Sequence, residues 1–76
     1  MKNQKITIDK VVATYKYLLE TAGYTSCDRV ADYLNATGFV NQRNRPVTRY
    51  NVHNYMNKTA EGKNLIGVTK ARIGRP

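Results

Sequence analysis

The helical spacing of apolar residues between Ile8 and Ala22 limits the possible folds of this chain more than any other feature of its sequence. These residues are Ile8, Val11, Val12, Tyr15, Leu18, Leu19 and Ala22. Because they recur mainly at intervals of three and four, they predict a helix over about Asp9 to Thr21 that buries one face. Asp9 favours the amino end of this helix through the helix dipole, and Ala22-Gly23 ends it.

A second, shorter helix is expected after Thr25-Ser26, which offers an N-cap, with Asp28 in its first turn. This helix runs for about ten residues and ends at Gly38. Its inner stripe consists of Val30, Ala31 and Leu34, and its solvent-facing side of Arg29, Asp32 and Asn35. Cys27 is expected to be half-buried at the start of the helix, where the dipole could lower the pKa of its thiol.

Two short extended arms, Phe39-Val40 and Pro46-Val47, flank a polar turn over residues 41–45 and predict a small hairpin or a loop. Thr48 follows as the N-cap of a third helix over about Arg49 to Lys58. The inner stripe of this third helix consists of Val52, Tyr55 and Met56. After Thr59 the helical period is lost.

Together these segments predict a mainly α protein. We expect a three-helix, helix-turn-helix-like domain over residues 1–68, with the short hairpin or loop before its third helix. A flexible basic tail is expected over residues 69–76. A chain of 76 residues has room for one domain only, because so short a chain buries too little surface to support two cores.

The charge is strongly basic and unevenly distributed. The chain has 13 Lys and Arg residues against 5 Asp and Glu residues, a net charge of +8. Residues 39–76 hold eight of the basic residues and one acidic residue, a net charge of +7, whereas residues 1–38 hold five and four, a net charge of +1. The second half is therefore expected to face an anionic partner, nucleic acid rather than a membrane surface.

Several other classes of protein are excluded by composition. No apolar run approaches the roughly 20 residues of a membrane span, and no signal peptide is recognisable, so we expect a soluble cytoplasmic protein of a bacterial or phage-infected cell, associated with the nucleoid. A single Cys27 and a single His53 form neither a disulfide nor a metal cage. The carboxylates are scattered over different elements, so we expect no enzyme, no cofactor and no small-molecule ligand.

The outer face of the third predicted helix carries the candidate base contacts. Tyr50, Asn54 and Asn57 point outward, Asn51, His53 and Lys58 lie on the flanks, and Arg49 lies near the edge. Asn weakens a helix and gains most when its amide is paired. In the major groove of DNA, Asn pairs with adenine and Arg with guanine. The alternative is a polar helix surface without a partner.

Candidate backbone contacts lie on both sides of this helix. Arg43 and Arg45 precede it and could meet a phosphate strand together with Thr48, the alternative being a solvated basic turn. Lys70, Arg72 and Arg75 lie in the expected tail. Its last three residues, Gly-Arg-Pro, are similar to the core of the AT-hook and to the minor-groove arm of small serine recombinases. A basic end with only non-specific affinity is the alternative.

A longer resemblance covers about 30 of the 76 residues. It is carried by Val30-Ala31, Leu34-Asn35, Gly38, Val40, the polar turn, Val47-Thr48, Val52 and Met56. In this pattern the chain resembles the DNA-binding "recombinase" segment that follows the catalytic domain of large serine recombinases. Val47 stands where that family usually has Trp, and Asn44 where it often has Gly. The resemblance implies the DNA-binding module, without strand exchange.

The sequence thus predicts a sequence-specific double-stranded DNA-binding protein that acts as a transcriptional regulator, most simply a repressor. One alternative is a recombination directionality factor or architectural protein that bends DNA. Another is a basic interaction protein that binds RNA or an acidic protein. A homodimer on two half-sites is also expected, because one small module reads few base pairs, and the apolar patch Leu65-Ile66-Gly67-Val68 offers a contact surface.

Overall fold

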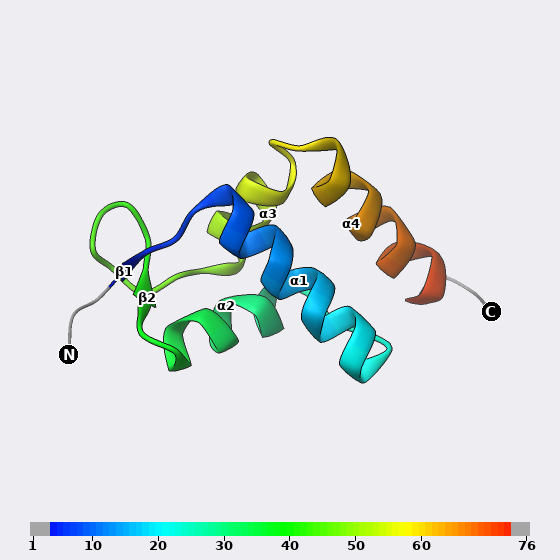
Figure 1. Ribbon diagram of the computed structural model, residues 1–76, viewed down its shortest axis with the longest axis horizontal. Helices are drawn as coiled ribbons and strands as arrows, with labels where there is room; N and C mark the ends of the chain where they lie inside the picture. The colour runs from blue at the N-terminus through cyan, green and yellow to red at the C-terminus, as the bar shows by residue number, and fades with distance from the viewer. Residues whose placement is uncertain (1–3, 74–76) are drawn as a thin grey trace.

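The computed structural model describes the backbone of residues 4–73 and the side chains of residues 4–70. The described residues form four helices, α1 (Ile8–Ala22), α2 (Cys27–Ala36), α3 (Arg49–Met56) and α4 (Ala60–Ile73), and two short strands, β1 (Gln4–Lys5) and β2 (Phe39–Val40) (Figure 1). The predicted mainly α class is confirmed, but the domain has four helices where three were expected. None of the described helices is long and apolar enough to cross a membrane.

The first three helices begin at hydroxyl N-caps. Thr7, Ser26 and Thr48 each accept a hydrogen bond from the backbone N–H three residues later. These bonds satisfy donors that the first turn of a helix leaves without partners. Helix α1 therefore starts at Ile8, directly after Thr7, and ends where Gly23 adopts the left-handed conformation with φ 76°.

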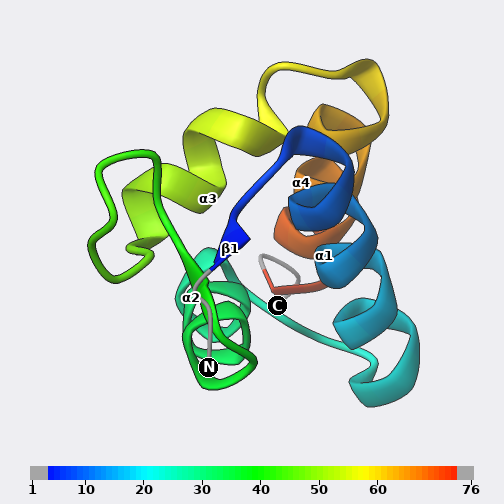
Figure 2. The same ribbon diagram turned by 60° about the vertical axis from the view of Figure 1, so that its left-hand side comes forward.

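The core lies where α1, α2 and α3 meet. It contains most of the inner stripes predicted for these helices, with Ile6 and Val47 added from the connecting segments. Its members are Ile6, Val11, Val12, Tyr15, Leu19, Val30, Ala31, Leu34, Val47, Val52 and Met56. Of the predicted stripe residues, Ile8, Leu18 and Tyr55 are only half-buried, and Ala22 is exposed. Because Val52 and Met56 are fully buried, the opposite face of α3 must point away from the protein (Figure 2).

The segment after Thr59 corrects the sequence prediction. It was expected to lack helical structure and to end in a flexible tail from residue 69, yet α4 continues to Ile73. Leu65, Ile66 and Val68 pack against the core, and the buried Thr69 hydroxyl accepts a hydrogen bond of 2.7 Å from the Tyr15 hydroxyl of α1. Two glycines within α4 and its incomplete apolar stripe conceal this helix from the sequence pattern.

The connection between α2 and α3 is a loop and not a hairpin. Its first arm, β2, pairs in parallel with β1, so that Gln4 faces Phe39 and Lys5 faces Val40. Pro46-Val47 forms no strand. Of the hairpin and the loop expected here, the loop is confirmed, because the amino-terminal segment, which is distant in sequence, is the strand partner of β2. The connection spans residues 37–48, longer than the turn of about three or four residues in a standard helix-turn-helix.

Candidate nucleic-acid interface

Helix α3 presents a polar outer face. Tyr50 is 66% exposed, while Val52 and Met56 on the inner side have no exposed surface. The other exposed residues of this region are Arg49, His53, Asn54, Asn57 and Lys58. Tyr55 is half-buried and packs against the core. The face expected from the helical wheel is therefore present, and its centre carries a phenol and two amides instead of charges.

The amino end of α3 is held by a capping box. Asn51 Nα donates to Thr48 Oγ1 at 3.3 Å, and Thr48 Nα donates to Asn51 Oδ1 at 3.0 Å. Asn51 Oδ1 also accepts from Asn41 Nδ2 at 3.4 Å. Asn51 and Thr48 were predicted from the sequence to be DNA contacts. In the structure their side chains fix the start of α3, which orients the outward residues that follow.

The loop that carries Arg43 and Arg45 is ordered by Asn41. Asn41 Oδ1 accepts hydrogen bonds from the backbone N–H groups of Arg43 and Arg45 at 2.8 and 3.0 Å. Asn44 takes the left-handed conformation with φ 65°, which Asn tolerates well. Gln42 Nε2 donates to the Ile6 carbonyl at 2.9 Å and ties the loop to the amino-terminal segment. Both arginines are exposed on a fixed backbone.

Asn35 links α2 to the entrance of α3. Its Nδ2 donates to the Val47 carbonyl at 2.9 Å, and its Oδ1 accepts from the Val47 N–H at 2.7 Å. The carboxamide thus pairs with the backbone as a neighbouring strand would. Asn35 is exposed, as predicted from helical spacing, but that spacing does not show its hydrogen bonds to a residue twelve positions later.

Replacing Asn35 by Ala is expected to lower the free energy of unfolding by about 1–3 kcal/mol, because both backbone groups of Val47 lose their partner in a part-buried position. Urea denaturation followed by circular dichroism measures the change. Asn64→Ala, at an exposed position on α4, is the matched control and should stay within about 0.5 kcal/mol of the parent protein. Equal stability of the two variants would contradict the role of Asn35.

Arg49 lies between α2 and α3. Its Nη1 is 3.9 Å from Asp28 Oδ2 in the first turn of α2, and its Nη2 donates to the Tyr50 hydroxyl at 3.2 Å. The hydrogen bond and the charge interaction with Tyr50, followed by the charge of Asp28, raise the pKa of Arg49. Both partners of the ion pair are exposed, so the pair adds little stability.

Two further polar side chains of α3 are paired with each other. Asn57 Nδ2 lies 2.9 Å from His53 Nε2, one helical turn away. Cys27 is half-buried, as expected, but burial, followed by the negative charge of Asp28, raises the pKa of its thiol, where a lowering was considered. The thiol is therefore neutral at physiological pH and poorly reactive.

The candidate cations fall into two separate groups. Arg43 and Arg45 lie on the loop, Arg49 begins α3 and Lys58 follows its end, while Lys70 is exposed near the carboxyl end of α4. The loop and this end of α4 lie on opposite sides of the molecule (Figure 1). The backbone of Arg72 belongs to α4, and Arg75, with its Gly-Arg-Pro sequence, lies outside the described residues.

No protein-family model matches this chain, and neither a curated protein nor a solved structure is significantly similar to it. Its function is therefore inferred from its own residues and their placement.

Proposed function

We propose that this chain is a sequence-specific double-stranded DNA-binding protein that regulates transcription, most simply as a repressor that occupies its site. The observation that carries the proposal is the outer face of α3, where Tyr50, Asn54 and Asn57 are exposed beside a loop with two fixed arginines. An α-helix fits the major groove, and amide side chains there distinguish adenine from the other bases. The resemblance to the large serine recombinase segment covers this same α2–α3 region and supports the assignment.

Selection of bound fragments from random duplex DNA tests the proposal. We expect enrichment of one short motif that contains adenine at the positions read by Asn54 or Asn57. The variant Asn54→Ala, selected in parallel, should lose preference at one position of that motif. Recovery of the input pool without any enriched motif would contradict sequence-specific binding.

The two loop arginines are assigned to phosphate contacts. Arg43→Ala and Arg45→Ala should each weaken binding on all duplexes alike and lower the slope of log affinity against log salt by about one unit. Fluorescence anisotropy over a series of salt concentrations measures this slope. Lys16→Ala, on the exposed face of α1, is the control of equal charge and should leave it unchanged. An unchanged slope in both arginine variants would remove the loop from the interface.

The contribution of the carboxyl-terminal cations to DNA affinity is better tested by a point variant than by a truncation. Removal of the chain after Val68 would delete Thr69, whose buried hydroxyl is bonded to Tyr15, and so would damage the fold. Lys70→Ala keeps this bond and removes one exposed charge. It should lower the salt slope and leave the enriched motif unchanged, because α3 keeps its reading face.

The homodimer stays a prediction, and one of the observations that suggested it no longer supports it. Leu65, Ile66 and Val68, which suggested a free apolar patch, pack against the core of the same chain. A palindromic motif in the selected DNA would support two copies on one site, as half-sites separated by a helical turn require two-fold symmetry.

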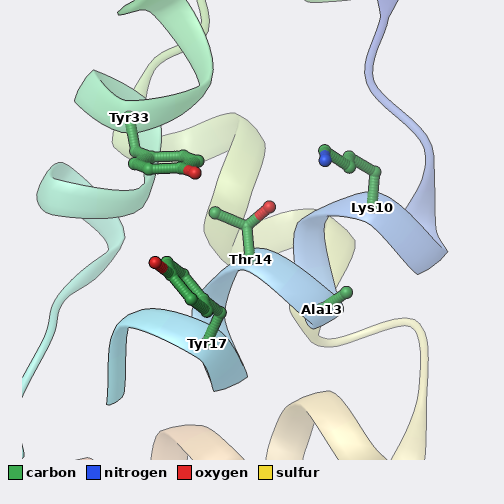
Figure 3. A pocket seen from close by; sticks show the side chains of 5 residues that line it. All are labelled: Lys10, Ala13, Thr14, Tyr17 and Tyr33. Carbon is green, nitrogen blue, oxygen red and sulfur yellow. The ribbon is translucent and has the colours of Figure 1, made fainter. Parts of the chain in front are cut away.

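Binding to RNA is a second candidate, which a hollow between α1 and α2 favours. It is lined by Lys10, Ala13, Thr14, Tyr17 and Tyr33 and holds about 230 Å³ (Figure 3). The Tyr17 and Tyr33 rings lie 6.2 Å apart, and both are exposed. Exposed aromatic rings beside a lysine suit the stacking of unpaired bases. A random RNA pool in the same selection decides between the two: enrichment from RNA alone would replace the DNA proposal.

A further inference from the structure

A second hollow lies on the proposed DNA-reading side, between the start of α2 and the start of α3. Four residues line it, namely Cys27, Arg49, Tyr50 and His53. It holds about 240 Å³ and is open to solvent. Unlike the rest of the outer face of α3, its walls are almost entirely apolar. We call it the α2/α3 hollow.

The apolar walls come from parts of polar side chains. The Tyr50 and His53 rings and the stem of Arg49 supply carbon surface, while their polar ends can reach the rim. Cys27 closes the inner side as a neutral thiol, because burial raises its pKa. Asp28, the neighbour of Cys27, lies 3.9 Å from Arg49 and holds that side chain at the edge of the hollow.

Size and surroundings restrict the occupant. The volume is below the roughly 300–1,000 Å³ of pockets that enclose a whole small-molecule ligand. Arg49 lines the hollow, and the net charge of +7 on residues 39–76 favours an anionic partner, as duplex DNA is. In the major groove, the 5-methyl group of thymine is the apolar feature among base edges that otherwise present hydrogen-bonding groups.

We infer that the α2/α3 hollow receives the 5-methyl group of a thymine and thereby selects thymine over cytosine at one position of the bound duplex. The inference rests on the proposed DNA-binding function and extends it from hydrogen bonding by amides to recognition of a methyl group. Tyr50 and His53, at the walls, are then specificity-determining residues through their carbon surface.

Replacement of thymine by deoxyuridine tests this, because it removes only the methyl group. The probe is the duplex enriched in the random selection, with each thymine replaced singly. We expect one position at which the dissociation constant rises about fourfold, the effect of losing one buried methyl group of about 0.8 kcal/mol. Where cytosine replaces this thymine, 5-methylation of the cytosine should recover about fourfold in affinity.

A variant that fills the α2/α3 hollow tests whether the difference between thymine and deoxyuridine arises there. Cys27→Met extends a longer side chain into it, and should abolish the difference between thymine and deoxyuridine at that position. Ala36→Met, at the exposed far end of α2, is the matched control and should preserve the difference. If Cys27→Met fails to fold by circular dichroism, His53→Ala, which removes an exposed wall, is used instead and should reduce the difference.

The outcomes separate the inference from the proposed function. Specific binding without any effect of deoxyuridine overturns the methyl site and leaves the DNA-binding function standing. An effect of deoxyuridine that persists in folded Cys27→Met, or in His53→Ala where Cys27→Met does not fold, places methyl recognition elsewhere and overturns the inference as well. Absence of an enriched duplex overturns the function and the inference together.

Discussion

Replacing Gly62 by Ala is expected to lower the free energy of unfolding by about 2–3 kcal/mol. A Cβ atom at this position would overlap the backbone carbonyl of Met56, the last residue of α3. Since the obstacle is backbone and not the end of a flexible side chain, α3 and α4 would have to move apart. The midpoint of thermal unfolding should fall by roughly 10–20 °C, because 1 kcal/mol corresponds to about 4–8 °C in a domain of this size.

Gly67→Ala is the matched control within the same helix. Among the described residues, no atom apart from the chain neighbours and the backbone of α4 itself would lie within 4 Å of a Cβ at Gly67, so the new methyl group meets open space. Ala is favoured over Gly in a helix by about 0.5–1 kcal/mol, and this variant should therefore be more stable than the parent protein. Calorimetry of both variants measures the two opposite shifts. A Gly62→Ala protein as stable as Gly67→Ala would show that α3 and α4 do not approach each other so closely.

Asn54→Ala is expected to have the largest effect on DNA binding. Its side chain lies at the outward centre of α3, and loss of a base contact costs about 1–3 kcal/mol of discrimination. Affinity for the selected duplex should therefore fall much more than affinity for a duplex of scrambled sequence. Tyr50→Ala should act in the same direction, since Tyr50 has the most exposed aromatic ring on this face. Titrations with both duplexes at one salt concentration give the comparison.

The control for this prediction is Asn64→Ala, which removes an exposed amide from α4 and should bind both duplexes as the parent protein does. An equal loss on the selected and scrambled duplexes in Asn54→Ala would reassign Asn54 from base recognition to backbone contact.

The helices that could be predicted from the sequence are those governed by local rules. Thr48 and Ser26 cap the helices that follow them, and the buried stripes of α1, α2 and α3 follow the period of 3.6 residues. Helix α4 could not be predicted in this way. Its stability comes from contacts with distant residues, such as the bond between Tyr15 and Thr69, which are 54 positions apart.

The same distinction applies to the candidate site. The exposed positions of α3 follow from helical geometry, so Tyr50, Asn54 and Asn57 could be identified from the sequence. The amides that order the surrounding segments could not be identified from the sequence. Asn41 and Asn35 act through hydrogen bonds to backbone groups that only the folded chain brings near. Asn41 did carry a signal, since Asn often bonds to the backbone two residues ahead in a turn.

The hydrogen bond between Tyr15 and Thr69 also fixes the distance of Lys70 from the rest of the molecule. It holds the far part of α4 against α1, so Lys70 is carried on a rigid arm. The molecule measures 43 Å along its longest axis, and the loop with Arg43 lies at the other end. One turn of duplex DNA is about 34–36 Å long. If the proposed function holds, a duplex that contacts both the loop and Lys70 is contacted over a length that the fold sets, whereas a flexible tail would leave that length variable.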